Sequence, residues 1–352
     1  MSSDRFAVFL DNEGPCTLSD NAYESTVQLA IECGLGEEVG RNFFRAISNV
    51  DDIWGDFDEH RPVQDPEYSA GGTLKVILAF LVAMKATSSW MRDFARSSLC
   101  VVPGIGQAIG VLDREFVLRQ ISTSYEFFVA EFCRIVHLDV GKIRCTKVPE
   151  FDALCLEEGE RLKLLRFVEE AARLPLIQYL PDGEIHPESK SVFDFVTRFV
   201  WQELYFDRAG VFLRTVKTIG QLQKREAVAE ILMDEDITLD HAMYVGDSQT
   251  DVQAIKLLAG RGLTVLFNGK GRHLFETADL AYIGEDAGVI TWVAQRFREL
   301  GREEVRRVCS MVHCFPDGGI LATIRPDSID ELERMSLTKR KSIRGVHIGS
   351  LT

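Results

Sequence analysis

The sequence lacks the features of a membrane-spanning or nucleic-acid-binding protein. Its longest uninterrupted apolar run, residues 76–84, is bracketed by Lys75 and Lys85. That run is far shorter than the roughly 20 apolar residues that a membrane-spanning helix needs. The formal net charge of −14 disfavours general binding to nucleic acids or anionic membranes, because phosphate groups attract basic surfaces. We therefore expect neither a membrane span nor a nucleic-acid partner.

Cysteine patterns that bind zinc or form a disulfide framework are also missing. The eight cysteines form no CxxC pair and no Cys/His array with zinc spacing,. The residues at the start of the sequence show no signal-peptide pattern. Together these absences favour a reducing compartment, and we expect a cytoplasmic protein.

Nucleotide-binding loops are not convincing either. No Walker A sequence is present, and the segment PGIGQAIG, residues 103–110, resembles a dinucleotide loop only in its glycine spacing. It has no clear strand before it, and no acidic residue ends a strand about 20 positions later, as ribose binding requires. We interpret these glycines as the start of a helix opened by Pro103.

Apolar strands alternate with amphipathic helices along the 352 residues,. Because helices rather than hairpins connect the strands, we expect an α/β fold with a Rossmann-like, doubly wound, mainly parallel sheet. Strands are predicted at residues 5–10, 116–121, 143–148, 241–248, 263–267 and 280–284. Helices are predicted at residues 20–50, 72–98, 103–112, 124–136, 157–173, 224–235 and 251–260.

Three polar residues lie at or just after the carboxyl ends of predicted strands: Asp11, Ser122 and Asp247. The carboxyl ends of parallel strands meet at one edge of the sheet, where α/β proteins bind ligands. Asp251 lies four residues after Asp247, and Lys224 lies 23 residues before it. The acids in YVGDSQTD also suit a simple helix N-terminus, so this segment alone leaves both interpretations open.

Taken in order, these motifs resemble those of the haloacid dehalogenase superfamily, and phosphoserine-phosphatase-like enzymes in particular. The matching pieces are FLDNEGP, the serine after a second strand, KREAVAEIL, and YVGDSQTD. The opening FLDNEGP also resembles an archaeal group in which some members are described as accessory subunits of hydrogenases. The resemblance covers about half of the chain.

The resemblance implies a phosphatase or phosphotransferase that works through an aspartyl-phosphate. Asp11 would be the nucleophile, which splits one difficult displacement into two easier ones. Mg²⁺ would allow carboxylate and phosphate to approach each other. The expected metal ligands are Asp11, Asp247 and the carbonyl of Glu13. The remaining assignments are Lys224 as a catalytic cation that also binds phosphate, Ser122 and Thr123 as phosphate-binding residues, Glu13 as acid and base, and Asp251 as the residue that orients the lysine or a metal-bound water.

Glu13 departs from the family pattern, which usually has Asp at this position. Its carboxyl group has suitable chemistry but one additional methylene, and a displacement of about 1 Å in a catalytic group can cost on the order of 10²-fold in rate. Pro15 and Thr250 also differ from the usual Thr and Asn. These departures keep a second hypothesis open, a catalytically weak or inactive binding or accessory subunit.

The resemblance also implies a division of the chain into parts. We expect a catalytic core, a mainly helical cap that closes over the site, a second insertion, and a C-terminal helix and tail without an assigned role. The expected bounds are 1–19, 103–123 and 217–300 for the core, 20–102 for the cap, 124–216 for the second insertion and 301–352 for the tail. Two sizeable insertions would crowd the approach to the site, which favours a small phosphorylated metabolite as substrate.

Two basic segments are interpreted as solvated. One is a loop after a predicted strand that contains Lys270 and Arg272, either of which could instead touch a substrate. The other is a helix end near the C-terminus with the cluster Lys339, Arg340, Lys341 and Arg344.

Overall fold

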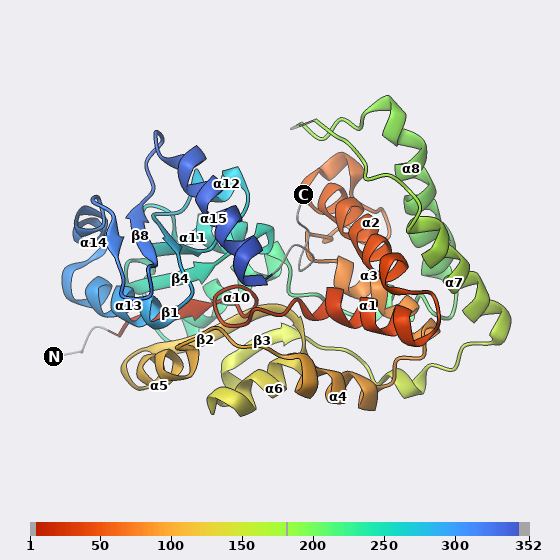
Figure 1. Ribbon diagram of the computed structural model, residues 1–352, viewed down its shortest axis with the longest axis horizontal. Coiled ribbons are helices and arrows are strands. Elements are labelled where there is room, and N and C mark those ends of the chain that lie inside the picture. Colours follow the sequence, from red (N-terminus) through yellow and green to blue (C-terminus); the bar gives the residue numbers. More distant parts are fainter. Residues whose placement is uncertain (1–4, 181, 345–352) are drawn as a thin grey trace.

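The protein is described by a computed structural model that covers residues 5–180 and 182–344 (Figure 1). The first four residues of the predicted core and the last eight of the predicted tail lie outside these described residues. The strands are β1 (Ala7–Leu10), β2 (Val117–Tyr125), β3 (Ile143–Thr146), β4 (Ala242–Gly246), β5 (Leu263–Phe267), β6 (Leu280–Ile283), β7 (His313–Cys314) and β8 (Ile320–Thr323).

All of these strands form one sheet in the order β3-β2-β1-β4-β5-β6-β8-β7. The strands from β3 to β6 are parallel, whereas β8 and β7 run antiparallel at the edge. In β1 the side chains alternate, so that Val8 and Leu10 enter one apolar cluster and Ala7 and Phe9 enter another. Both faces of the sheet are therefore buried, and the predicted α/β class with a mainly parallel sheet is confirmed.

Helices cover the two faces as crossover connections require. One face packs against α5 (Ile105–Glu115), α6 (Glu126–Val136), α13 (Gly288–Leu300) and α14 (Arg302–Val308). The other face packs against α10 (Gln221–Asp234), α11 (Val252–Leu258), α12 (Arg272–Phe275) and α15 (Ile329–Arg344). The connections leave the carboxyl ends of β1 and β4 at the same edge.

A helical domain lies beside this edge, on the right in Figure 1. It consists of α1 (Asn21–Glu32), α2 (Glu37–Asp56), α3 (Thr73–Ala83), α4 (Ser88–Ser98), α7 (Glu158–Ala171), α8 (Pro187–Arg198) and α9 (Val211–Thr215). These helices share a single apolar cluster that includes Trp54, Phe80, Phe167 and Trp201. Both predicted insertions thus contribute to one helical domain.

Several boundaries differ from those predicted. Residues 126–146, placed in the second insertion, form α6 and β3 and belong to the core because β3 pairs with β2. The segment 20–50 is two helices, and so is 72–98, whose break contains Lys85 in a positive-φ conformation (φ 72°). Residues 313–344 add two strands to the sheet and a long helix across its edge.

Within the described part of the chain, none of the helices has the length and apolar character of a membrane span. The helices α3 and α4 reach them only when they are taken together, and they are bent by 113° at their junction.

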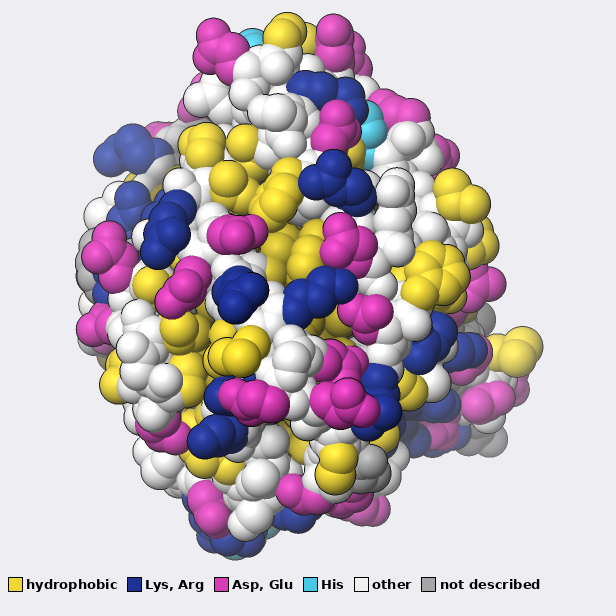
Figure 2. All heavy atoms as spheres, turned by 90° about the vertical axis from the view of Figure 1, so that its right-hand side faces the viewer, with side chains coloured by type: hydrophobic (Ala, Val, Ile, Leu, Met, Phe, Trp, Pro, Cys, Tyr) yellow, Lys and Arg dark blue, Asp and Glu magenta, His cyan; other side chains and the backbone are white. Residues whose placement is uncertain are grey.

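The outward face of the helical domain carries basic and acidic side chains interspersed with one another (Figure 2).

Candidate active site

Asp11 begins the loop that follows β1, and its backbone is still tied to the sheet. Its N–H donates to the carbonyl of Val245 in β4 at 2.9 Å. Three residues later, Gly14 has a φ of 97°, and a Cβ atom there would lie 2.3 Å from Asp247 Oδ2. Only glycine allows this turn and this close approach. The loop after β1 therefore lies directly against the carboxylate that follows β4.

Lys224 lies in the first turn of α10 and joins two of the predicted acids. Its ammonium group is 2.7 Å from Asp11 Oδ2 and 2.8 Å from Asp251 Oδ1. The side chain is completely buried. Although burial opposes the charge, Asp11 and Asp251 raise the pKa of Lys224 above its usual value, so it stays protonated at neutral pH,.

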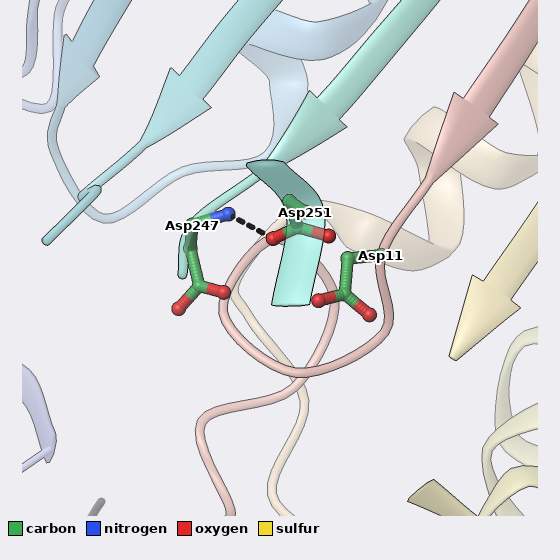
Figure 3. Close-up of side chains that lie close together, drawn as sticks. All are labelled: Asp11, Asp247 and Asp251. Atoms are coloured by element: carbon green, nitrogen blue, oxygen red, sulfur yellow. Dashed lines mark hydrogen bonds between the residues drawn. The ribbon is translucent and has the colours of Figure 1, made fainter. Parts of the chain in front are cut away.

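Asp251 uses both carboxylate oxygens within the protein, and Figure 3 shows the hydrogen bond that one of them accepts from the backbone N–H of Asp247. Oδ1 accepts hydrogen bonds from Lys224 and from the Tyr244 hydroxyl at 2.7 Å. Oδ2 accepts from the backbone N–H groups of Asp247 at 2.8 Å and Ser248 at 3.1 Å. Burial opposes ionisation, but Lys224 and these donors hold the pKa of Asp251 below its usual value. Its contacts are those of a group that orients Lys224 and the loop after β4.

Asp11, Asp247 and Asp251 form a compact carboxylate cluster (Figure 3), with one oxygen of each within 4.8 Å of the others. Burial raises the pKa of Asp11 well above its usual value, and the charges of Asp251 and Asp247 add to this effect. A buried group of carboxylate oxygens suits a hard divalent cation such as Mg²⁺. Because each oxygen of Asp251 already accepts two hydrogen bonds, Asp11 and Asp247 are the side chains best placed to hold one.

Asp247 has partners that the sequence analysis missed. Arg340 Nη1 forms an ion pair with Asp247 Oδ2, and Arg344 Nη1 lies 3.6 Å from the same oxygen. Both arginines are buried, so the interpretation of this segment as a solvated helix end is wrong for them. The packing of Ile329 and Leu332 onto the sheet places α15 across the edge of the core and directs these side chains inward.

Lys270 is a third basic residue that the sequence analysis placed in a solvated segment. Its backbone N–H donates to the Asp247 carbonyl at 2.9 Å, directly beside the site. Burial lowers the pKa of the Lys270 ammonium to about 8, and the charge of Arg340 contributes. Asp52 of α2 partly offsets this shift, which brings the helical domain into the electrostatics of the site.

Glu13 reaches the helical domain with its side chain. Its Oε1 accepts hydrogen bonds from the Ser124 hydroxyl at 2.8 Å and from the side chain and backbone of Asn21 at 3.1 and 3.2 Å. Asn21 is the first residue of α1. Burial raises the pKa of Glu13 to about 7, with a further contribution from Asp20, while Ser124 opposes the shift. A group with this pKa exchanges protons at neutral pH.

Ser122 and Thr123 lie within β2, which continues to Tyr125 instead of ending at residue 121. Pairing of β2 with β1 stops at Gln120, so both residues project beyond that pair of strands. The Ser122 hydroxyl accepts a hydrogen bond from the backbone N–H of Ser124 at 3.1 Å and keeps its own proton for another acceptor. The Thr123 hydroxyl donates to the Ile219 carbonyl at 2.9 Å, so its proton is already engaged.

The structure thus brings Asp11, Lys224, Asp247 and Asp251 into one buried network. Glu13 is held at the side of this network by Asn21 and Ser124. The residues missed by sequence reasoning lie in the helical domain, in β2 and β4, and in α15. They are Asn21, Ser124, Tyr244, Arg340 and Arg344.

The fold defined above is that of an α/β protein with a helical domain beside the carboxyl edge of its sheet. The chain is similar to a gene product of Archaeoglobus fulgidus, with 24% identity, 98% of this chain and 99% of that chain covered, and a TM-score of 0.79. The two proteins therefore share their fold over nearly their full lengths.

Structures of phosphoserine phosphatase are more distant. One in the apo form has 15% identity, covers 82% of this chain and 98% of its own, and has a TM-score of 0.44. A probable phosphoserine phosphatase from Vibrio cholerae has 14% identity, coverage of 82% and 66%, and a TM-score of 0.43. No protein-family model and no curated protein matches the chain.

Proposed function

We propose that the protein is a phosphatase or phosphotransferase of the haloacid dehalogenase superfamily, phosphoserine-phosphatase-like, that acts on a small phosphorylated metabolite through an aspartyl-phosphate. The observation that carries this proposal is the buried network in which Lys224 contacts both Asp11 and Asp251, with Asp247 beside them. An acid, a shared lysine and a second acid at one sheet edge suit phosphoryl transfer, which depends on positioning and on charge stabilisation.

In the first step, a carboxylate oxygen of Asp11 attacks phosphorus and the bond from phosphorus to the leaving oxygen breaks. Glu13 donates its proton to that oxygen, and its pKa of about 7 suits this role at neutral pH,. Lys224 and the Ser122 hydroxyl stabilise the negative charge on the transferred group. In the second step, water attacks phosphorus, Glu13 takes a proton from it, the bond to Asp11 breaks and inorganic phosphate leaves.

Mg²⁺ fits the donor set, and Asp11, Asp247 and the carbonyl of Glu13 would hold it. When bound, Mg²⁺ would reduce the repulsion between the carboxylates and an incoming phosphate. Asp251 would keep Lys224 charged and in place, because its other hydrogen bonds fix the loop after β4.

The helical domain supports a small substrate rather than a macromolecule. Asp56 of α2 accepts hydrogen bonds from Gln221 at 2.9 Å and Gln249 at 2.7 Å, and both glutamines belong to the core beside the site. These contacts hold the domain over the sheet edge, where it would exclude water during the reaction. We propose a cytoplasmic location on the basis of free cysteines throughout the described part of the chain,.

An alternative function is a binding or accessory subunit with weak or no catalysis, as in the group described as hydrogenase accessory subunits. Two contacts favour it: the ion pair of Arg340 with the expected metal ligand Asp247, and the three hydrogen bonds on one oxygen of Glu13.

The experiment is a panel of phosphomonoesters assayed with and without Mg²⁺. We expect Mg²⁺-dependent turnover in the wild-type chain and a loss of at least about 10³-fold in Asp11→Asn, since the amide cannot form the covalent intermediate. Asp240→Asn, which removes an exposed carboxylate paired with Arg261, is the matched control and should retain full activity. Inactivity of the wild type across the panel would favour the accessory function.

A further inference from the structure

We propose that α15 places Arg340 as an internal competitor of the divalent cation at Asp247, so that this helix sets the metal concentration at which the site is loaded. This inference concerns regulation of the proposed phosphatase site and rests on that proposed function. Its basis is the contact between a C-terminal helix and the carboxylate expected to bind the metal.

The contacts of the two arginines converge on one carboxylate oxygen. Arg340 Nη1 pairs with Asp247 Oδ2 and also donates to the carbonyl of Asn268 at 3.0 Å. Arg344 Nη1 lies 3.6 Å from that oxygen, while its Nε donates to the carbonyl of Leu18 at 2.8 Å. Asp247, Arg340 and Arg344 are exposed by only 2%, 5% and 7%. The pair is therefore largely shielded from water.

The rest of α15 holds these arginines in place. The Ser336 hydroxyl donates to the Gly269 carbonyl at 2.6 Å, and Glu333 accepts from the Gly271 N–H at 3.2 Å. Lys339 forms an ion pair with Glu285 at 3.0 Å on the outer side of the helix. Figure 1 shows α15 running across the sheet edge toward the helical domain. The arginines thus belong to an anchored helix whose position is set by contacts outside the site.

A guanidinium group at this position weakens metal binding for two reasons. It engages one oxygen of Asp247, and it places a positive charge directly beside that carboxylate,. A divalent cation at Asp247 must therefore displace Arg340 or bind beside a like charge, and the repulsion is strong where water is excluded. Lys224 balances Asp11 and Asp251 in the same network, so Asp247 is the carboxylate whose balancing charge comes from α15.

The test is a Mg²⁺ titration of the full chain by isothermal titration calorimetry, without any substrate. We expect Arg340→Met to bind Mg²⁺ about tenfold more tightly than the wild type, because it keeps an unbranched apolar side chain but removes the guanidinium group and its charge. Arg340→Lys keeps the charge and should stay within about threefold of the wild type. Lys339→Met removes a positive charge from the adjacent position of the same helix and should leave the Kd unchanged.

An unchanged or weaker affinity in Arg340→Met would overturn the inference, since it would mean that Arg340 is neutral toward the metal or positions Asp247 for it. An absence of Mg²⁺ binding in both the wild type and Arg340→Met would also overturn the inference. Thermal melting shows whether each variant is folded. If Arg340→Met is unfolded, Arg344→Met replaces it, with a severalfold tightening expected and an unchanged affinity contradicting the proposal.

Failure of this inference is distinguishable from failure of the proposed function. Wild-type turnover together with equal Mg²⁺ affinity in Arg340→Met would leave the phosphatase proposal intact and remove the role of α15. Tighter Mg²⁺ binding in Arg340→Met without any turnover would support the role of α15 and contradict the phosphatase proposal.

Discussion

Glu13 uses its additional methylene to reach across to the helical domain. The carboxylate bonds to Asn21, the first residue of α1, and to Ser124 of β2. An aspartate at this position has a shorter side chain and would not reach these donors without movement of the loop. The difference from the haloacid dehalogenase motif that the sequence resembles thus has a structural counterpart in the contacts of this chain.

For Glu13→Asp we expect a loss on the order of 10²-fold in kcat/KM with an alkyl phosphomonoester, because the proton donor is displaced. The loss with p-nitrophenyl phosphate should be much smaller, since that leaving group needs little protonation. Because Glu13 must be protonated to donate and its pKa is about 7, wild-type turnover of the alkyl ester should fall as pH rises above 7. Steady-state rates from pH 5 to 9 measure both effects. Equal losses on the two substrates would contradict the role of Glu13 as proton donor.

At the same scale, sequence reasoning found the acids and the lysine but missed the arginines. Asp11, Asp247 and Asp251 follow buried strands, and Lys224 begins a helix, so each is marked by its local sequence. A buried arginine in a charged helix has no such mark, because its burial depends on where α15 packs. Arg340 and Arg344 lie four residues apart and share one helix face, which was the only signal available.

At the scale of elements, α1 connects the site to the helical domain through its first turn. Asp20 accepts a hydrogen bond from the Tyr23 N–H at 3.1 Å and caps the helix, and Glu24 accepts from the Asp20 N–H at 3.2 Å. Burial raises the pKa of Glu24 to about 7, and the charge of Asp20 adds to this effect. The first turn therefore carries a carboxylate that is costly to ionise.

This raised pKa predicts a pH-dependent contribution to stability. The folded-state pKa of Glu24, about 7, lies above its ordinary value of 4.5, so its favourable contribution is complete below pH 4.5 and is lost as pH rises toward 7 and beyond. Glu24→Gln has no carboxyl group to ionise, so its stability does not fall in this way as pH rises. Its free energy of unfolding should exceed that of the wild type by about 1–2 kcal/mol at pH 8, a value that allows for partial exposure of the side chain.

Urea unfolding at pH 4.5 and pH 8 measures the difference for Glu24→Gln. The two proteins should be close at the lower pH and separate at the higher one. Destabilisation of the variant at pH 8 would show that the charge of Glu24 stabilises the N-terminus of α1 by more than burial costs.

The strands and most helices were predictable because their apolar periodicity is local. The errors lie where tertiary contacts decide. Lys85 interrupts a continuous helical pattern between α3 and α4 with a positive φ. The strand β3 was predicted but placed outside the core, and only its pairing with β2 from Gln120 onward shows that it belongs to the sheet. The antiparallel strands β7 and β8 are short and carry too few residues for a pattern.

At the scale of the whole molecule, two distant segments of the chain form one helical domain beside the sheet edge. Sequence patterns indicated that insertions exist, but they did not show that residues 21–98 and 158–215 share one apolar cluster. That domain contacts the core through Asp56 and also through Ser69, whose hydroxyl donates to Gln223 at 2.9 Å. The network of Asp11, Lys224 and Asp251 is therefore enclosed between the helical domain and the core, to which α15 belongs.

The central claim is that Asp11 carries the phosphoryl group during turnover. The most direct measurement is to incubate the full chain with Mg²⁺ and acetyl phosphate, quench with acid, reduce with borohydride and locate the modified residue by peptide mass spectrometry. The account predicts homoserine in place of Asp11 in the wild type and no modification in Asp11→Asn. Modification at another residue, or none in a wild-type protein that hydrolyses acetyl phosphate, would contradict it.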